Sequence, residues 1–411
     1  MQAEVLAIGS EITSGRTVNT NASYLARRLE ELGIPCVRQA AVADQPALII
    51  RQIRDALRRS DLVVTTGGLG PTFDDMTVDA LAQAVGRPLV RFPNVARAIK
   101  AFCRRHGRRI TALALRQAWL PQGAVALPNP LGTAPGLWLE TRGAVLIALP
   151  GVPHEMQGIM TRGVIPRLRR QAGRSVIAGR TIRTVGLVEL RIQQLIERLR
   201  IPSTVQIGLY PHLMAVDIRL TVTGASRGAA DRLLTRVERR LRARLGEAVY
   251  AVGDQTLEEA AGQALVKRRA TLALAESCTG GLIAEQLTDV PGSSRYFKLG
   301  TVVYHNRMKE RVLGVSVREL HRHGAVSAPV AKAMAAGVRR VAGTTFGLAV
   351  TGIAGPTGAT PTKPVGLVYL ALADARRVDA RQFVFRGDRL GIRRQESQMA
   401  LDWIRRRAQR A

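Results

Sequence analysis

The chain has 411 residues, enough for about two or three compact domains, and its 46% of apolar residues is ordinary for a globular protein. No stretch approaches the roughly 20 uninterrupted apolar residues of a membrane span, and the start lacks the features of a signal peptide. We therefore expect a soluble, cytoplasmic protein with no membrane partner. The three cysteines are widely spaced and support neither a disulfide framework nor a zinc site.

The formal net charge of +30 comes mostly from arginine, because only six lysines are present. The arginines are spread along the whole chain in pairs such as Arg27-Arg28, Arg104-Arg105 and Arg339-Arg340, mostly on the polar faces of predicted helices. A phosphate-binding surface needs clustered charge. The distribution therefore argues against specific nucleic-acid binding, whereas weak non-specific adhesion at low salt is expected.

Strand and helix patterns alternate through residues 1–170, as is typical of a parallel α/β sheet. In chain order we predict a strand at 3–8, a helix at 21–32, a strand at 34–42, a helix at 46–59, a strand at 62–66, a helix at 76–85, an edge hairpin of 136–140 and 145–149, and a helix after Pro153.

The pattern changes in residues 171–252, where a small α+β module is predicted. Its elements are a strand at 181–185, a helix at 187–199, a strand at 215–223 and a helix at 229–245, followed by a connector at 246–256. A third domain, 253–411, begins with a helix at 257–268 and a strand at 271–275 and continues in α/β alternation. The predicted fold class is α/β, with two three-layer α/β domains joined by the small module.

A glycine-rich loop follows the strand at 62–66 and runs from Gly67 to Pro71 before Asp74-Asp75. Ligands of open α/β sheets bind beyond the carboxyl ends of the strands, and glycines let the backbone approach phosphates. The two carboxylates could hold a divalent cation against a pyrophosphate, or they could cap the next helix. A second loop, Gly9-Ser10-Glu11, adds a carboxylate at the same expected edge.

These loops, with Asn19-Thr20-Asn21, the stretch 128–136 and the turn 149–153, resemble the N-terminal half of CinA proteins, apart from a departure at 12–14. The resemblance implies a MoaB/MogA-like, molybdopterin-binding fold and metal-dependent cleavage of ADP-ribose at its pyrophosphate. It implies nucleotide contacts from Gly9, Glu11, Asn21, Gly67, Gly68, Gly70 and Pro71, and a divalent metal ion on Asp74 and Asp75.

The middle module resembles the KH-like domain of CinA proteins. RNA-binding KH domains clamp the backbone with a GXXG loop, and the sequence of this module has none. We interpret it as a spacer or dimerisation element.

A second constellation begins where the strand at 271–275 runs into Glu276-Ser277-Cys278-Thr279-Gly280-Gly281. A serine at a strand-to-helix turn is exposed near helix N-terminal amides that can stabilise an oxyanion, so we expect the amides near Gly280 and Gly281 to do so. Serine needs a base, and Lys309 lies 32 residues later. Spacing alone leaves open a surface role for Lys309 and a nucleophilic role for Cys278, although strand alternation points Ser277 and Cys278 in different directions.

The segment 275–281, Tyr304 with Asn306 and Lys309, and the loops 351–356 and 363–366 resemble the CinA C-terminal domain, although Thr357 and Ala359 replace an acidic residue and a glycine of the family pattern. The resemblance implies a nicotinamide mononucleotide deamidase that needs no cofactor, and a homodimer. It implies Ser277 as nucleophile, Lys309 as base and Tyr304 in a proton relay. Substrate contacts are expected from Thr279, Gly280, Gly281, Gly352, Ile353, Ala354, Gly355 and Arg389.

Three functions follow from these patterns. The first is a hydrolase of pyridine-nucleotide salvage that acts on nicotinamide mononucleotide and on ADP-ribose. The second is a molybdopterin-binding or competence-related protein with an inactive deamidase domain. The third is a nucleic-acid partner, which the dispersed charge and the missing GXXG loop disfavour.

Overall fold

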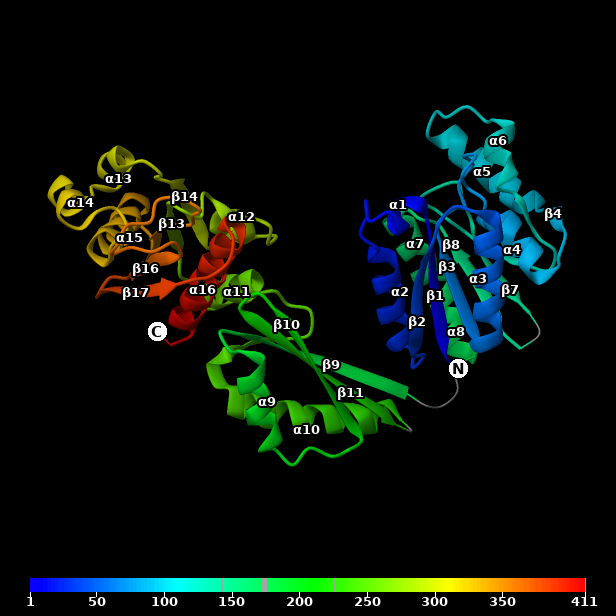
Figure 1. The fold of residues 1–411 in the computed structure, drawn as a ribbon, viewed down its shortest axis with the longest axis horizontal. Coiled ribbons are helices and arrows are strands. Elements are labelled where there is room, and N and C mark those ends of the chain that lie inside the picture. Colours follow the sequence, from blue (N-terminus) through cyan, green and yellow to red (C-terminus); the bar gives the residue numbers. More distant parts are fainter. Residues whose placement is uncertain (142, 172–175, 225, 411) are drawn as a thin grey trace. The chain divides into compact units, whose positions relative to one another are not determined.

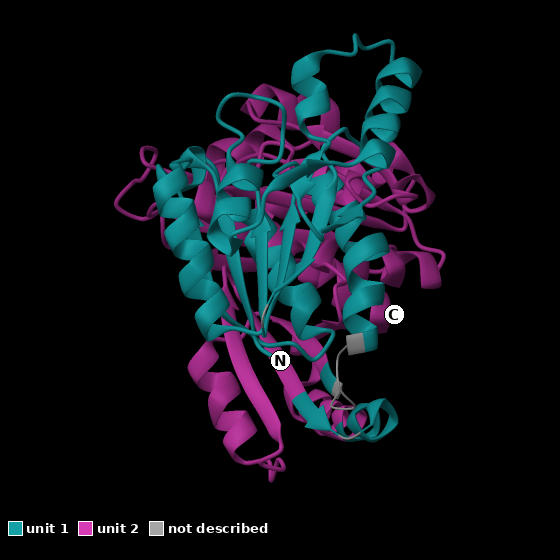
Figure 2. Ribbon diagram, turned by 90° about the vertical axis from the view of Figure 1, so that its right-hand side faces the viewer, with its two compact units in different colours: residues 1–178, 222–233 teal, residues 179–221, 234–411 magenta. Residues whose placement is uncertain are grey.

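The computed structural model describes residues 1–141, 143–171, 176–224 and 226–410 (Figure 1). They form two compact units, residues 1–178 with 222–233 and residues 179–221 with 234–411 (Figure 2). Within the described residues, no helix combines the length and apolar character needed to cross a membrane.

The first sheet has the strand order β2-β1-β3-β8-β7-β6. Its strands are β1 (Ala3–Ile8), β2 (Cys36–Val42), β3 (Leu62–Thr66), β6 (Val125–Leu127), β7 (Gly136–Glu140) and β8 (Val145–Leu149). The helices around it are α1 (Ser10–Thr13), α2 (Thr20–Glu30), α3 (Pro46–Arg59), α4 (Thr77–Val85), α5 (Pro93–Arg105), α6 (Ala112–Arg116), α7 (Pro153–Ile159) and α8 (Ile165–Gln171), with a π-helical turn at Met160–Val164. A short pair, β4 (Leu89–Arg91) and β5 (Trp119–Pro121), brackets α5 and α6.

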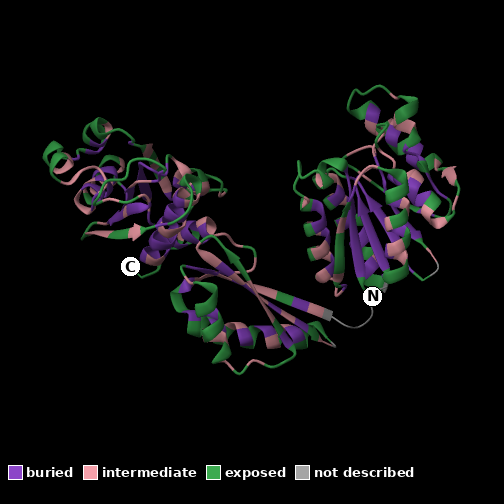
Figure 3. Ribbon diagram, in the orientation of Figure 1, coloured by how far each residue is buried: buried purple, intermediate pink, exposed green. Residues whose placement is uncertain are grey.

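Helices cover both faces of this sheet, which makes three layers. Ile49 and Ile53 of α3 belong to one core cluster, and Leu25 and Leu29 of α2 belong to the other. Because both faces are covered, β1 and β3 are buried at every residue (Figure 3).

The predicted hairpin of 136–140 and 145–149 forms, but it does not lie at the edge of the sheet. Strand β8 pairs in parallel with β3 and antiparallel with β7, and β6 follows β7 as the outermost strand. The reason is burial, since four of the five residues of β7 are buried and an edge position would expose this strand.

The middle module contains a four-stranded sheet with the order β10-β11-β9-β12. The strands are β9 (Val176–Val185), β10 (Val205–His212), β11 (Ala215–Gly224) and β12 (Val249–Val252), and the helices are α9 (Glu189–Glu197) and α10 (Arg227–Leu245) with a 3-10 turn at Gly246–Ala248. The sequence prediction missed β10. It was also wrong about the connector at 246–256, because β12 pairs antiparallel with β9 and belongs to this sheet.

The C-terminal domain is built on a sheet with the order β14-β13-β15-β16-β17. Its strands are β13 (Leu272–Glu276), β14 (Phe297–Val302), β15 (Phe346–Gly352), β16 (Leu367–Ala373) and β17 (Val378–Val384). Its helices are α11 (Leu257–Lys267), α12 (Leu282–Thr288), α13 (Asn306–Leu313), α14 (Val317–His323), α15 (Ala328–Ala342) and α16 (Arg389–Arg410), with a 3-10 turn at Ser293–Arg295.

This domain also has three layers. Leu265 of α11 and Ile404 of α16 belong to one core cluster, whereas Leu313 of α13 and Met334 of α15 belong to another. Strand β13 pairs in parallel with β14 and β15, so the carboxyl ends of these three strands meet at one edge. The predicted fold class, two three-layer α/β domains with a small module between them in the sequence, is confirmed.

Candidate functional site

Ser277 is the first residue after β13, at the edge where the parallel strands end. Its backbone N–H donates to the carbonyl of Val350 in β15 at 3.1 Å, which holds the turn against the neighbouring strand. The side chain is mostly buried, and Ser277 Oγ lies 3.3 Å from Lys309 Nζ. The predicted pair therefore comes together in the fold.

Lys309 lies on α13 and is only 1% exposed. Its Nζ donates to the carbonyls of Val303 at 2.8 Å and Tyr304 at 2.9 Å. Burial lowers the pKa of the Lys309 amine below its ordinary value. A neutral amine has two N–H groups and one lone pair, so the two carbonyls can take both hydrogens and leave the lone pair for the Ser277 hydroxyl.

Cys278 points away from this pair, toward α16. Its Sγ donates to Glu396 Oε2 at 2.9 Å, and it packs in the core cluster on the α16 side of the sheet. Burial, reinforced by the Glu396 carboxylate, raises the pKa of the Cys278 thiol well above its ordinary value. A protonated, buried thiol is a poor nucleophile, so the geometry favours Ser277.

The turn after Ser277 is closed by its own polar groups. The Glu276 carboxylate accepts hydrogen bonds from the amides of Gly281, Ile283 and Ala284 at 2.9–3.2 Å, and the amide of Gly280 donates to the Ser277 carbonyl. The expectation that the amides of Gly280 and Gly281 form an oxyanion hole is therefore wrong for this conformation. Glu276 uses the first free amides of α12 as its cap.

The other predicted substrate contacts lie around the same edge. Gly352 ends β15, and Ile353 pairs with Leu367 through the backbone ahead of Ala354 and Gly355. Arg389, at the start of α16, donates to the Gly355 carbonyl at 2.7 Å and to the Tyr304 hydroxyl at 3.2 Å. Tyr304 thus touches Lys309 through its carbonyl, while its exposed hydroxyl accepts from Arg389. Among the described residues this hydroxyl has no hydrogen bond to Ser277 or Lys309, so this arrangement does not form the predicted proton relay.

Two residues of α16 also contact the turn, and neither was predicted from the sequence. Arg393 Nε and Nη2 donate to the Thr279 carbonyl at 3.2 and 2.6 Å, and Glu396 accepts from Cys278. Burial raises the pKa of Glu396 to about 7. They lie 114 and 118 residues beyond their partners, so no local spacing links them to Ser277.

The N-terminal domain carries a cleft of about 280 Å³ at the carboxyl ends of β1 and β3. The predicted residues on its wall are Gly9, Glu11, Asn21, Gly67, Gly68, Asp74 and Asp75, whereas Gly70 and Pro71 do not line it. Asp44 also lines the cleft, and sequence reasoning missed it although it follows β2.

Asn21 and Gly67 fix the floor of this cleft. Asn21 Nδ2 donates to Thr66 Oγ1 at 3.1 Å and to the Gly151 carbonyl at 2.7 Å, while its buried Oδ1 has no hydrogen-bond partner among the described residues. Gly67 has a φ of 109°, and a Cβ there would lie 2.0 Å from the Ile8 carbonyl oxygen. Only glycine fits this crossing of two loops.

The two aspartates have separate roles in the structure. The Asp75 carboxylate accepts from the amide and hydroxyl of Thr72 and closes the loop, while Asp74 is exposed. Neither caps α4, which begins at Thr77 without a side-chain cap, so that alternative is wrong. In the described part of the chain, no three His, Cys, Asp or Glu residues are grouped as a metal site.

Three family models match the sequence. They are "Probable molybdopterin binding domain" over residues 4–170, "Damage-inducible protein CinA KH domain" over 179–251 and "CinA C-terminal domain" over 254–408. A CinA-like protein of Gloeobacter violaceus is 42% identical over 98% of this chain and 96% of its own length, and one of Kosmotoga olearia is 40% identical over 99% and 98%. The chain belongs to the CinA family.

Solved CinA structures are similar to parts of the chain. The protein CinA of Thermoplasma acidophilum is 39% identical and covers 41% of this chain and 97% of its own, with a TM-score of 0.38. A CinA superfamily protein of Escherichia coli is 28% identical and covers 39% and 97%, with a TM-score of 0.36. The domain boundaries at 170/171 and 252/253, the cytoplasmic location and the homodimer stay predictions for this CinA-family chain.

Proposed function

We propose that the C-terminal domain is an amidohydrolase that converts nicotinamide mononucleotide to nicotinate mononucleotide and ammonia. The observation that carries the proposal is the 3.3 Å approach of Ser277 Oγ to a buried Lys309 amine that has a lowered pKa. A buried lysine beside a serine at a strand end is suited to activate the hydroxyl.

The proposed reaction has two halves. Lys309 takes the Ser277 proton while Oγ bonds to the carboxamide carbon, and then gives that proton to the leaving nitrogen as the C–N bond breaks and ammonia departs. Water next attacks the resulting ester, with Lys309 taking its proton and returning it to Ser277 Oγ. The Val303 and Tyr304 carbonyls hold the amine in place through both halves.

Arg389 supports the choice of a nucleotide substrate. Its guanidinium lies at the same strand edge, held by the Gly355 carbonyl and the Tyr304 hydroxyl. A planar guanidinium can bind a phosphate in a bidentate manner, and these two contacts orient it for that purpose. Tyr304, Gly355 and Arg389 then bind and orient the nucleotide, while Ser277 and Lys309 carry out the chemistry.

Ammonia release from nicotinamide mononucleotide tests the proposal. The wild-type chain should release ammonia, and Ser277→Ala and Lys309→Ala should lose at least about 10³-fold in kcat. Lys332→Ala is the matched control, because this lysine is exposed on α15. Unchanged release in both site variants would overturn the mechanism, and a silent wild-type chain would overturn the activity.

A second activity is proposed for the N-terminal cleft, the metal-dependent cleavage of ADP-ribose at its pyrophosphate. Its support is the cleft wall, where glycine loops face the carboxylates of Glu11, Asp44 and Asp74. The predicted metal pair was Asp74 and Asp75, but the Asp75 carboxylate is bound to Thr72. With no group of three protein ligands in the described residues, a divalent ion would therefore rest on Asp74 and on substrate oxygens. Such an ion would neutralise the pyrophosphate charge.

Release of adenosine monophosphate from ADP-ribose tests this activity. It should require Mg²⁺ or Mn²⁺, stop with a chelator and fall in Asp74→Asn but not in Asp61→Asn, an exposed aspartate outside the cleft. Tight molybdopterin binding without ADP-ribose cleavage or deamidation would favour the cofactor-binding alternative.

A further inference from the structure

The C-terminal domain also contains a cavity, which lies between β17 and α16. It has a volume of about 250 Å³, and none of its lining residues belongs to the sites described above. Its wall is formed by Arg377, Asp379, Ala380, Arg381, Trp403, Arg406, Arg407 and Arg410. Five guanidinium groups thus share one concave surface with a single carboxylate.

The carboxylates near this cavity are already bound to particular arginines. Asp379 accepts from Arg407 at 2.6 Å and pairs with Arg377 at 3.2 Å. Asp402, which does not line the cavity, pairs with Arg406 at 2.7 Å. These contacts hold the arginines in place and leave little negative charge for the cavity.

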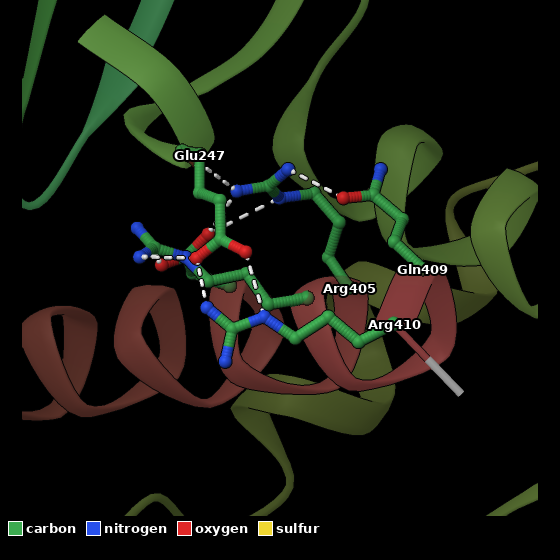
Figure 4. A network of polar contacts seen from close by, with 6 residues as sticks. Glu247, Arg405, Gln409 and Arg410 are labelled. Carbon is green, nitrogen blue, oxygen red and sulfur yellow. Dashed lines mark hydrogen bonds and ion pairs between the residues drawn. The ribbon is translucent and has the colours of Figure 1, made fainter.

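Arg410 is held in the same way at the end of α16. Its Nε donates to a Glu247 carboxylate oxygen at 2.6 Å, and Figure 4 shows this contact beside the bond from Arg405 to the Glu247 backbone. Glu247 therefore orders the last turn of α16, which brings Arg406 and Arg410 to the cavity.

Arg381 differs from its neighbours because no ion pair of the described residues includes it. Its guanidinium carbon lies 4.5 Å from the centre of the Trp403 ring. Partial loss of water at this otherwise exposed side chain, together with the charges of Arg406 and Arg410, lowers the pKa of Arg381. The stacking fixes the plane of the guanidinium while its five N–H donors stay available to a ligand.

We propose that this cavity is a binding site for a phosphoanion of the size of phosphate or pyrophosphate. A multiply charged anion would pair with Arg381 and relieve the repulsion among the five guanidinium groups. The planar fork of arginine matches phosphate oxygens, and the rim is ordered before the ligand arrives. The volume favours the phosphate part of a ligand over a whole dinucleotide.

The test is calorimetric titration of the full chain with inorganic pyrophosphate at fixed ionic strength. We expect saturable binding, weakened about tenfold or more in Arg381→Ala, which corresponds to the loss of one charge-assisted contact. Arg318→Ala, an exposed arginine on α14, removes the same charge elsewhere and should leave this binding unchanged. Arg389→Ala should also retain it, which separates this cavity from the deamidase site.

Binding that Arg381→Ala and Arg318→Ala weaken equally would overturn the proposal, because it would reflect the overall charge. Absence of saturable binding would overturn it as well. Arg381 is an exposed side chain, so its variant should fold, and Arg381→Lys provides a second check because it keeps the charge and loses the planar fork. Titration with adenosine monophosphate identifies the source of the anion: tighter binding than that of phosphate would indicate a nucleotide, and equal binding a free anion.

Discussion

At the scale of single residues, the Lys309 amine is shielded from water and forms no ion pair with a carboxylate of the described residues. Burial therefore lowers its pKa, and the neutral form that can accept a proton becomes available at lower pH than in water. On α16, burial raises the pKa of the Glu396 carboxyl, the opposite direction to the shift at Lys309. The pH dependence of activity and of stability can therefore test the environments of Lys309 and Glu396.

We predict that kcat/KM for deamidation rises with pH through the lowered pKa of Lys309 and levels off below 10.5, the ordinary value for lysine. The sign follows because the base must be neutral. The check is a pH profile measured in wild type and in Glu396→Gln, which removes the second titrating group. A rate that is flat over the whole range, or that climbs only near 10.5, would contradict the assignment of Lys309 as base.

Glu396→Gln should also change the pH dependence of stability. The pKa of Glu396 is raised from 4.5 to about 7, so between these values the folded chain keeps a proton that the unfolded chain has lost. This contribution is present below about 4.5 and disappears as the pH rises through 7. Relative to wild type, the free energy of unfolding of Glu396→Gln should therefore increase between pH 5 and pH 8, by roughly 1–3 kcal/mol. Denaturant titrations at both pH values provide the check, and a difference independent of pH would contradict the shift.

At the scale of elements, the turn from β13 to α12 is organised by one carboxylate. Glu276 binds three amides at the start of α12, so a single side chain both caps the helix and shapes the loop that carries Ser277. In the N-terminal domain, Gly67 plays a similar structural role, because the lack of a side chain there lets the loops after β1 and β3 approach closely.

Glu276→Gln should lower the free energy of unfolding by about 1–3 kcal/mol, because a neutral amide oxygen accepts these bonds more weakly than a carboxylate. Activity should fall as the Ser277 turn loosens. Denaturant titration and ammonia release give the two readings. Glu285→Gln, an exposed change on α12 itself, is the control. Equal effects in both variants would show that the cap is unimportant.

Gly67→Ala should be far more damaging than Gly86→Ala. Both glycines have positive φ, but a Cβ on Gly67 would lie 2.0 Å from the Ile8 carbonyl, whereas a Cβ on Gly86 meets nothing within 4 Å. We expect Gly86→Ala to cost about 1–2 kcal/mol from its backbone conformation alone and Gly67→Ala to cost more, with loss of nucleotide binding in the cleft. Thermal unfolding of both variants compares them directly, and similar costs would contradict the close approach of the Gly67 and Ile8 loops.

At the scale of the whole molecule, a net charge of +30 is distributed over the sequence rather than gathered in one tail. Many of the arginines are engaged in ion pairs with acidic neighbours, as Arg405 and Arg406 are with Asp402. The excess positive charge is therefore spread over the whole chain and is not concentrated in one binding surface. A net charge of this size should still attract polyanions over long distances.

We predict that the chain binds DNA at low salt without regard to sequence and releases it between about 50 and 200 mM salt. Fluorescence anisotropy with two unrelated duplexes, measured over that range, provides the check. Binding that resists salt, or that separates the two duplexes, would instead support the nucleic-acid function that the dispersed charge disfavours.

Much of the architecture could be predicted from local patterns. The helix at 46–59 has the predicted bounds because its apolar residues recur at the helical period, and the strand at 62–66 has them because it is a short run of apolar and β-branched residues ahead of a glycine loop. Strand β12 was mistaken for a connector because a run of four residues has no period to measure, and its pairing with β9 is made 65 residues away at Val249 and Thr184.

The amino-acid pattern was enough to predict the alternation of strands and helices, the loops that end the strands, and the resemblance that singled out Ser277, Tyr304 and Lys309. The groups that these residues contact became visible in the folded chain. It buries Lys309 beside Ser277, turns Cys278 toward Glu396, and occupies the amides of Gly280 and Gly281 within the turn. The reactivity of these groups depends on how close they lie in space and on how well they are shielded from water. Because the residues involved are far apart in the chain, their sequence spacing gives neither the distance nor the burial.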